Sequence, residues 1–162
     1  SNKERIYGQY KTATTIRSEI MPDKIFITWT QIQEASRLIA DNARDMEYKA
    51  VIGIQRGGLI PAVIISHELD IPMYSVNCSL RDHVNKPTMI HDIPHGRYLC
   101  VDDINDTGET FRFLQDMFDQ RNLDIDYAVI HDNIPSEFSV DYWFQKIDKD
   151  KEPTWIVYPW EK

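Results

Sequence analysis

An alternation of apolar runs with helix-like segments between residues 50 and 130 constrains the fold more than any other feature of the sequence. The run "AVIGI" (Ala50–Ile54) is continuously apolar, as expected of a parallel strand that is covered on both faces. The same pattern predicts three further strands, at residues 72–78, 98–101 and 126–130, and two helices, at residues 59–69 and 109–121. The alternation therefore predicts an α/β fold with a doubly wound, mainly parallel sheet.

The chain ahead of this alternation divides into an extension and a strand–helix pair. Residues 1–24 are polar and weakly periodic, and we interpret them as an extension. "KIFITW" (Lys24–Trp29) predicts a short strand. Thr30, with Gln33 three residues later, has the form of a capping box that starts a helix over residues 31–45. One face of that helix is apolar and is expected to be buried: Ile32, Ala35, Ile39 and Ala43.

Two regions have no regular period. Residues 79–96 are polar, contain two prolines and are expected to form a long loop, and loops of this length in compact domains often act as lids. Residues 131–162 are rich in aromatic side chains and are expected to form an irregular C-terminal hood. We expect residues 25–162 to form one domain with a five-stranded parallel core. Several aromatic residues are expected to pack in the hood, the core or an interface: Tyr142, Trp143, Phe144, Trp29 and Trp160.

The composition argues against some classes of function. The 162 residues carry a formal net charge of −8, with a pI of about 5.0, which argues against binding to the phosphate backbone of nucleic acids. A small anionic ligand remains compatible with this charge, because backbone amides or a metal can hold it locally. Cys78 and Cys100 lie in apolar, strand-like runs without a C-x-x-C pair, so reduced thiols are expected. No signal peptide or long apolar run is recognisable, and we expect a cytoplasmic location without membrane partners.

The most unusual stretch is "YLCVDDINDTGETF" (residues 98–111), in which an apolar strand runs into three aspartates. The small residues of Thr107–Thr110 open the next helix, so that backbone N–H groups and hydroxyls can converge on a phosphate. Asp102 and Asp103 could accept hydrogen bonds from two sugar hydroxyls or hold Mg²⁺ through water. Asp106 would then lie between sugar and phosphate, as an acid, a base or a charge stabiliser. Acids are favoured at helix N-termini in any case, but this accounts poorly for two adjacent acids that end a strand.

A second unusual turn, "QRGG" (Gln55–Gly58), follows the strand at residues 50–54. Two glycines allow the backbone to approach a ligand closely, and Arg56 offers a cation for phosphate oxygens. The alternative is a tight strand–helix turn with an exposed arginine. Both unusual turns are expected beyond the carboxyl ends of parallel strands, where open α/β sheets bind ligands.

These motifs resemble those of the type I phosphoribosyltransferases. "YLCVDDINDTGET" is similar to the family's phosphoribosyl pyrophosphate signature, an apolar strand followed by two acids, two spacers and D-T-G-x-T, and "RGG" matches the family's pyrophosphate loop. The likeness is closest to the xanthine-guanine and hypoxanthine purine phosphoribosyltransferases, which share an "ITW"-like start and a "TWI-x-x-PW-[DE]" end, here Thr154–Glu161. It extends from Ile25 to Glu161.

The resemblance implies Mg²⁺-dependent transfer of a 5-phosphoribosyl group from phosphoribosyl pyrophosphate to a nucleobase, with a purine expected, and release of pyrophosphate. It also implies a dimer or tetramer. The resemblance implies that Thr107, Gly108 and Thr110, with the amides of Asp106 and Glu109, bind the 5-phosphate, and that Asp102 and Asp103 bind the ribose hydroxyls and Mg²⁺. It implies that Arg56 and Gly57 bind the pyrophosphate and that Asp106 is the general base. It also implies that Trp155 and the backbone of Ile156 bind the base.

The long loop at residues 79–96 contains further polar candidates. Arg81 and Lys86 are either cations of a lid that closes over the reacting centre or solvated loop charges. His91-Asp92 with His95 could suggest a metal site, but we interpret them as loop residues, because their spacing is loose and a proline separates them.

One departure from the family's pattern concerns the base. The purine enzymes carry a lysine that contacts the exocyclic oxygen of 6-oxopurines, and the matching stretch here is His131-Asp132-Asn133. Asn133 could donate or accept a hydrogen bond there, whereas an ionised Asp132 could only accept. Either the base differs from guanine and xanthine, for instance by an amino group at that position, or the contact comes from elsewhere in the chain.

A regulatory protein with the same fold, which binds phosphoribosyl pyrophosphate or nucleotides without turnover, is the alternative function. The acidic charge and the lack of a basic stripe argue against its acting on nucleic acid. The presence of Asp106, which ligand sensing alone does not require, favours an enzyme.

Overall fold

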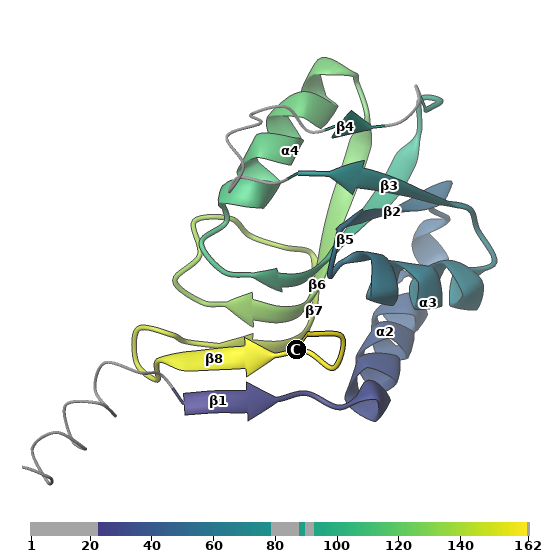
Figure 1. Cartoon of the computed structure of the whole chain (residues 1–162). Helices are drawn as coiled ribbons and strands as arrows, with labels where there is room; N and C mark the ends of the chain where they lie inside the picture. Colours follow the sequence, from purple (N-terminus) through teal and green to yellow (C-terminus); the bar gives the residue numbers. More distant parts are fainter. Residues whose placement is uncertain (1–22, 79–87, 90–92, 162) are drawn as a thin grey trace, which may run out of the picture.

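The main sheet has six strands in the order β4-β3-β2-β5-β6-β7 (Figure 1). The computed structural model describes residues 23–78, 88–89 and 93–161. The strands are β2 (Ala50–Gln55), β3 (Met73–Asn77), β4 (Thr88–Met89), β5 (Arg97–Asn105), β6 (Asp124–Asn133) and β7 (Tyr142–Ile147). All neighbours are parallel except β4, which pairs antiparallel with β3. The core therefore has five parallel strands as predicted, although β7 and not the segment at residues 24–29 is the fifth, and one short antiparallel strand lies at its edge.

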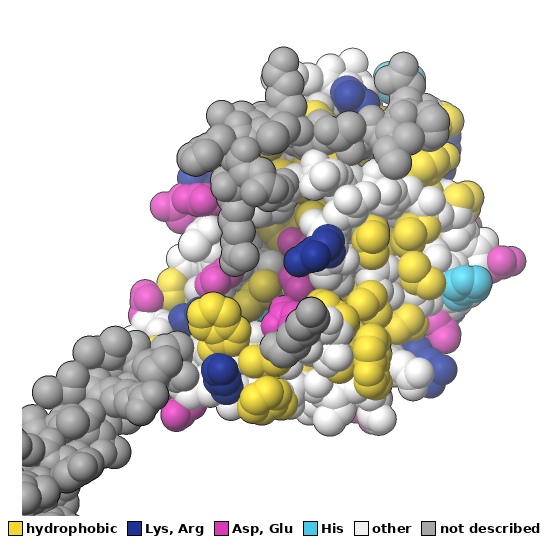
Figure 2. Space-filling model, in the orientation of Figure 1, with side chains coloured by type: hydrophobic (Ala, Val, Ile, Leu, Met, Phe, Trp, Pro, Cys, Tyr) yellow, Lys and Arg dark blue, Asp and Glu magenta, His cyan; other side chains and the backbone are white. Residues whose placement is uncertain are grey.

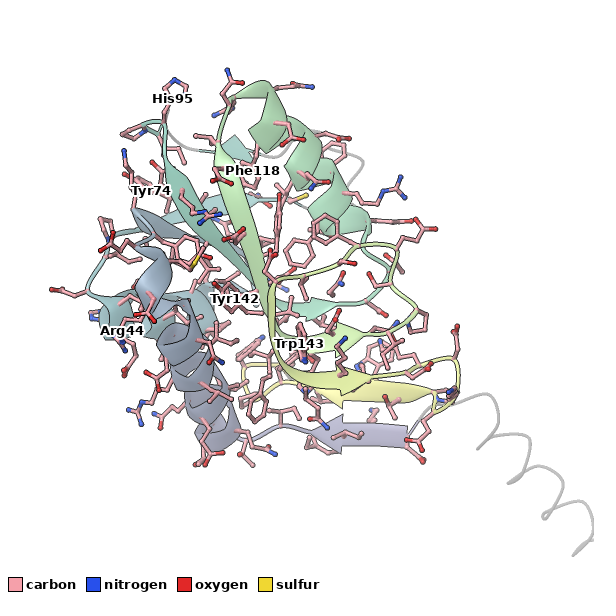
Figure 3. All side chains as sticks on the ribbon, turned by 180° about the vertical axis from the view of Figure 1, so that it is seen from behind. Arg44, Tyr74, His95, Phe118, Tyr142 and Trp143 are labelled. Carbon is pink, nitrogen blue, oxygen red and sulfur yellow. The ribbon has the colours of Figure 1, made fainter. Side chains whose placement is uncertain are left out.

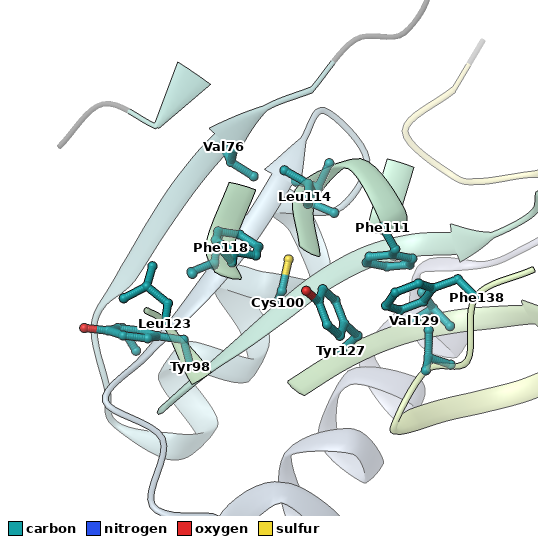
Figure 4. Close-up of a cluster of buried hydrophobic side chains, with 14 residues drawn as sticks. Val76, Tyr98, Cys100, Phe111, Leu114, Phe118, Leu123, Tyr127, Val129 and Phe138 are labelled. Carbon is teal, nitrogen blue, oxygen red and sulfur yellow. The ribbon is translucent and has the colours of Figure 1, made fainter. Parts of the chain in front are cut away.

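Helices cover both faces of this sheet. Helices α2 (Trp29–Ala43) and α3 (Leu59–Leu69) pack on one face, and α4 (Glu109–Gln120) packs on the other. Alternate residues of each strand supply the two cores, since Ile52 and Cys100 contact the α4 side whereas Val51 and Leu99 contact the α2–α3 side. The α4 side combines aliphatic side chains with aromatic rings, and Figure 4 shows the rings of Phe111, Tyr127 and Phe138 packed against one another. The doubly wound arrangement is confirmed.

A second, two-stranded sheet forms the hood. Strands β1 (Asp23–Phe26) and β8 (Thr154–Val157) are parallel, with Asp23 opposite Thr154 and Phe26 opposite Val157. Beneath them lies a third apolar cluster, whose buried members are Ile27, Ile32, Ala35, Ile130, Ile156 and Tyr158. The prediction of an irregular tail was wrong in two respects. Strand β7 extends the main sheet, and β8 pairs with a strand from the other end of the chain.

The strand that carries the aspartates is longer than its apolar run suggested. β5 continues through Asp102 and Asp103 to Asn105, because β6 still pairs with it there, with Asn105 opposite Asp132. Pairing of β5 with β2 stops at Val101. The same correction applies to β6, which includes His131-Asp132-Asn133 rather than ending before them.

The start of α2 also differs from the prediction. The capping box is formed by Thr28 and Gln31, not by Thr30 and Gln33. The Gln31 amide N–H donates to Thr28 Oγ1 (3.2 Å), and the Thr28 N–H donates to Gln31 Oε1 (2.8 Å). Both pairs fit the capping pattern, and the earlier pair is used because the chain turns directly after β1. The predicted apolar face of the helix is buried as expected.

Two tryptophans that were expected to be packed are half exposed. Trp29 has 53% of its surface exposed, although its ring centroid lies 6.1 Å from that of Trp160. Trp143 on β7 is 43% exposed, and the Lys146 ammonium lies 4.3 Å from the centre of its ring (Figure 3). The prediction that Trp143 packs in the hood was wrong, because β7 turns its side chain outward. Trp29 does not lie in the core, and its alternative placement in an interface stays a prediction.

Some predictions lie outside the described residues. These are the extension up to residue 22, the candidate lid cations Arg81 and Lys86, and the loop residues His91 and Asp92. Cys78 and Cys100 are free thiols, as expected. None of the described helices is long and apolar enough to cross a membrane.

Candidate active site

The two unusual turns meet at one edge of the sheet, where β2 and β5 end. Because the strands are parallel, the turn after β2 and the aspartates of β5 lie at the same edge. Acidic side chains gather near the middle of this face of the molecule, with hydrophobic side chains below them (Figure 2). The expectation that both turns occupy the carboxyl ends of the strands is met.

Gly57 lies directly against the acid pair. A Cβ atom at Gly57 would be 2.1 Å from Asp103 Oδ2 and 3.3 Å from Trp160 Nε1. A Cβ atom at Gly58 would be 2.5 Å from the Val101 carbonyl oxygen. The Gln55–Arg56 peptide bond is cis, and the Arg56 side chain is exposed. The two glycines are therefore required so that this turn can press against the end of β5.

The carboxylates of Asp102 and Asp103 are partly buried and close to each other. Asp102 Oδ1 accepts from the Asp103 amide (2.8 Å), and Asp103 Oδ1 accepts from the Ile104 amide (2.8 Å). Burial raises the pKa of Asp102 well above its ordinary value, and the charge of Asp103 adds to the rise. Burial also raises the pKa of Asp103, and hydrogen bonds to its carboxylate partly offset this rise. Such a pair is suited to a ligand that brings a cation or hydroxyl donors, since either favours the ionised form.

Two buried side chains, those of Tyr158 and His131, form hydrogen bonds that hold the backbone of Asp103 in place. The Tyr158 hydroxyl donates to the Asp103 carbonyl (3.2 Å) and lies 2.9 Å from His131 Nδ1. Burial lowers the pKa of His131 to about 4, so its imidazole is neutral near pH 7. Since the hydroxyl hydrogen goes to the carbonyl, Nδ1 of His131 carries the hydrogen of the second bond. His131 therefore supports β5 and does not face a ligand.

The turn between β5 and α4 has the form of an anion site. Gly108 has φ +91°, in the region that favours glycine, and a Cβ atom there would be 2.8 Å from Phe138. The cap position of α4 is Gly108, which has no side chain to offer, so the N–H groups of the first turn beyond that of Glu109 remain available to an anion. Thr107 Oγ1 accepts from the Glu109 amide (3.3 Å), and its hydroxyl is exposed.

Asn105 fixes the position of this turn. Its buried amide group donates to Asp132 Oδ1 (2.9 Å) and to the Phe138 carbonyl (2.8 Å), and it accepts from Ser136 Oγ (2.9 Å). These bonds tie the end of β5 to the segment that follows β6. Asp132 is thus engaged inside the protein, where it cannot read a base.

Asp106 is held by two residues from later in the chain. Asn133 Nδ2 donates to the Asp106 carbonyl (3.0 Å) and to Asp106 Oδ1 (3.3 Å). Lys149 Nζ donates to Asp106 Oδ2 (2.9 Å), in an ion pair of partly exposed side chains. The carboxylate that was predicted to act at the reacting centre is therefore positioned on both of its oxygens.

The predicted base-binding residues lie in the hood. Trp155 on β8 is 56% exposed, and the Ile156 side chain is buried in the cluster beneath β1 and β8. Among the described residues, no hydrogen bond joins Trp155 to Asp106, whose carboxylate is bonded to Asn133 and Lys149. The turn between β7 and β8 does connect the two regions, because it carries Lys149 at its start and leads to Trp155 at its end.

Sequence reasoning missed three residues of the site: Asn105, Lys149 and Tyr158. Asn105 was treated as a spacer inside the aspartate motif. Tyr158 lies within the "TWIVYPWE" motif and could have been suspected from it. Lys149 is one of several charges in "DKDKE", and no sequence signal distinguishes it from its neighbours.

Comparisons with known proteins agree with the motifs. The phosphoribosyl transferase domain model matches residues 28–161. A xanthine-guanine phosphoribosyltransferase of Idiomarina loihiensis is 33% identical over 149 residues, which are 85% of this chain and 87% of that protein. The enzyme of the same name from Nitratidesulfovibrio vulgaris is 30% identical over 146 residues, 85% of either chain. The crystal structure of a purine phosphoribosyltransferase from Pyrococcus horikoshii has a TM-score of 0.75 at 31% identity, covering 86% of this chain and 95% of that chain.

Proposed function

The chain belongs to the phosphoribosyl transferase domain family and transfers a 5-phosphoribosyl group from phosphoribosyl pyrophosphate to a nucleobase; we propose that the accepted base is a purine. One observation supports the assignment of the site. The turn at Gly57, the acids Asp102 and Asp103, and the turn at Gly108 before α4 all lie at the carboxyl ends of the strands. The purine is supported by the relatives at 30–33% identity, which are named as xanthine-guanine enzymes.

The donor substrate lies along the end of β5. Its 5-phosphate is bound by the hydroxyls of Thr107 and Thr110 and by N–H groups of the first turn of α4. Arg56 and the backbone of Gly57 approach the pyrophosphate, for which an exposed guanidinium and an open backbone are suited.

Asp102 and Asp103 receive the ribose hydroxyls and Mg²⁺. Two carboxylates are the number with which proteins commonly hold Mg²⁺ when substrate phosphates complete its shell. The described residues contain no group of three or more His, Cys, Asp or Glu side chains that could hold a metal ion. When bound, Mg²⁺ supplies positive charge to the leaving pyrophosphate.

The reaction builds positive charge on the ribose ring as pyrophosphate leaves with the bonding electron pair. Asp102 and Asp103, held rigidly by amide hydrogen bonds, stabilise that charge. A ring nitrogen of the base attacks the ribose carbon, and Asp106 accepts the proton that the base loses. The bonds from Asn133 and Lys149 orient Asp106 for this step.

The base stacks on Trp155 and contacts the backbone of Ile156. An indole ring that is more than half exposed can form such a stack without first breaking a packed core. Assembly into a dimer or tetramer and a cytoplasmic location remain predictions.

A panel of bases with phosphoribosyl pyrophosphate and Mg²⁺ tests the proposal by release of pyrophosphate. Guanine, xanthine, hypoxanthine, adenine and orotate are compared at equal concentration. Turnover with at least one purine and none with orotate is expected. Absence of turnover with every purine, or best turnover with orotate, would contradict it. A mobility shift of RNA or DNA without turnover would instead favour the regulatory alternative.

A further inference from the structure

Lys149 lies at the reacting carboxylate although no motif includes it. Its Nζ is 2.9 Å from Asp106 Oδ2, and the two side chains have 27% and 47% of their surfaces exposed. A lysine ammonium has three donors, so the bond to Asp106 leaves two of them for a ligand. The carboxylate and the ammonium thus form an adjacent acceptor and donor at the place proposed for the base.

The backbone of Lys149 is fixed on both sides. Its N–H donates to Asn133 Oδ1 (3.0 Å). Asp148 Oδ1 accepts from the amides of Asp150 (3.1 Å) and Lys151 (3.2 Å), and the Asp148 carbonyl accepts from Glu152 (2.9 Å). These bonds close a tight turn of the kind that aspartate side chains stabilise. Lys149 is therefore presented by a rigid turn, and its ammonium lies within reach of Asp106 for that reason.

Asn133 occupies the position from which a base contact was first expected, and its amide is already used. Its Oδ1 accepts from Lys149, and its Nδ2 donates to both the backbone and the side chain of Asp106. With an exposed fraction of only 6%, it holds the other two residues together.

We propose, on the basis of the function proposed above, that Lys149 reads the exocyclic oxygen of a 6-oxopurine while the neighbouring Asp106 accepts a ring N–H of the same base. A 6-oxopurine presents an acceptor at its exocyclic position, whereas adenine presents an amino donor there. An ammonium would face that amino group donor to donor, so the site selects guanine-like bases against adenine. The contact comes from the β7–β8 turn, so Lys149 takes the place of the lysine that the purine enzymes carry after the strand equivalent to β6.

Other lysines of this region do not fit the role. The Lys146 ammonium lies over the Trp143 ring, and Lys151 is exposed. Lys151 provides the matched control, because it has the same charge in the same turn and its side chain is not part of the proposed contact.

The experiment compares wild type, Lys149→Met, Lys149→Arg and Lys151→Ala, each checked for an unchanged unfolding midpoint. We expect Lys149→Met to raise the KM for guanine and hypoxanthine by about 10- to 100-fold, the range for a hydrogen bond to a charged group. The KM for phosphoribosyl pyrophosphate should stay constant, the preference over adenine should shrink, and Lys149→Arg should recover part of the loss. Lys151→Ala should match wild type.

Two results would overturn the inference. One is an unchanged KM for 6-oxopurines in Lys149→Met. The other is an equal fall of kcat for all bases, which would assign Lys149 to orienting Asp106 alone. Calorimetric binding of inosine and adenosine monophosphates separates this inference from the proposed function, because it requires no turnover. If wild type turns over no base, tighter binding of inosine monophosphate that Lys149→Met abolishes still supports the role of Lys149, and equal binding of both nucleotides refutes it.

Discussion

Gly57→Ala should impair catalysis far more than folding. The added methyl carbon would lie 2.1 Å from Asp103 Oδ2, where ordinary contact begins at 3.4 Å. The carboxylate must therefore move by roughly 1.3 Å, and misplacement of a reacting group by about 1 Å can cost on the order of 100-fold in rate. The carboxylate is the far end of a side chain and can rotate away, so we expect the unfolding free energy to fall only by the ~1–3 kcal/mol typical of overpacking.

The assay is steady-state pyrophosphate release with phosphoribosyl pyrophosphate varied at saturating base, together with urea unfolding. We expect kcat/KM for phosphoribosyl pyrophosphate to fall by about 100-fold. Gly53→Ala is the matched control. Its methyl group would meet the Ala62 Cβ at 2.8 Å, between β2 and α3, so it should lower stability and leave kcat/KM of the folded enzyme near wild type. Wild-type kcat/KM in Gly57→Ala would refute the idea that the position of Asp103 matters.

Three further substitutions test other parts of the site. Asp106→Asn should lower kcat by about 10²–10⁴-fold. Calorimetry should show that the variant still binds phosphoribosyl pyrophosphate, and loss of this binding would mean that Asp106 binds that substrate instead of acting in the chemical step. Trp155→Ala should raise the KM for the base by about 5- to 150-fold, from a stacking energy of ~1–3 kcal/mol. Trp143→Ala, which also removes an exposed indole, should leave this KM unchanged, and equal effects would argue against a stack. His131 has a folded-state pKa of about 4 against an ordinary 6.5, so the unfolded chain binds more protons between these values and the unfolding free energy falls as pH drops from 6.5 to 4. His131→Gln should flatten that decline by up to about 3 kcal/mol in urea titrations at pH 4.5 and 7.5, and an unchanged slope would contradict a buried neutral imidazole.

The central strands and helices followed from the sequence because each carries its own local signal. The run Ala50–Ile54 became β2, and the apolar face of α2 is buried as expected. Strand ends were less predictable. The polar residues Asp102 and Asp103 belong to β5 because β6 continues beside them, and pairing partners distant in sequence leave no local trace.

The position of the residues proposed to bind the donor was predictable for a similar reason, whereas the neighbours of Asp106 were not. Gly57, Gly108 and the acids belong to compact motifs in which each residue type is demanded by backbone geometry or charge. The neighbours of Asp106 come from residues 133 and 149, which a strand and a turn bring back to β5. A lysine in a charged turn has the composition of any solvated loop, so only the folded arrangement identifies it.

Strands β1 and β8 are adjacent in space although about 130 positions separate them along the chain. Bringing together two segments so far apart in sequence is slow and costs conformational entropy. During synthesis the ribosome delivers β2, β5 and α4 well before β8. The segments proposed to hold the sugar phosphate can thus assemble on a nascent chain before Trp155, the residue proposed to stack on the base, has been added. The proposed pocket for the acceptor base can therefore form only after the proposed donor site, because it needs β8.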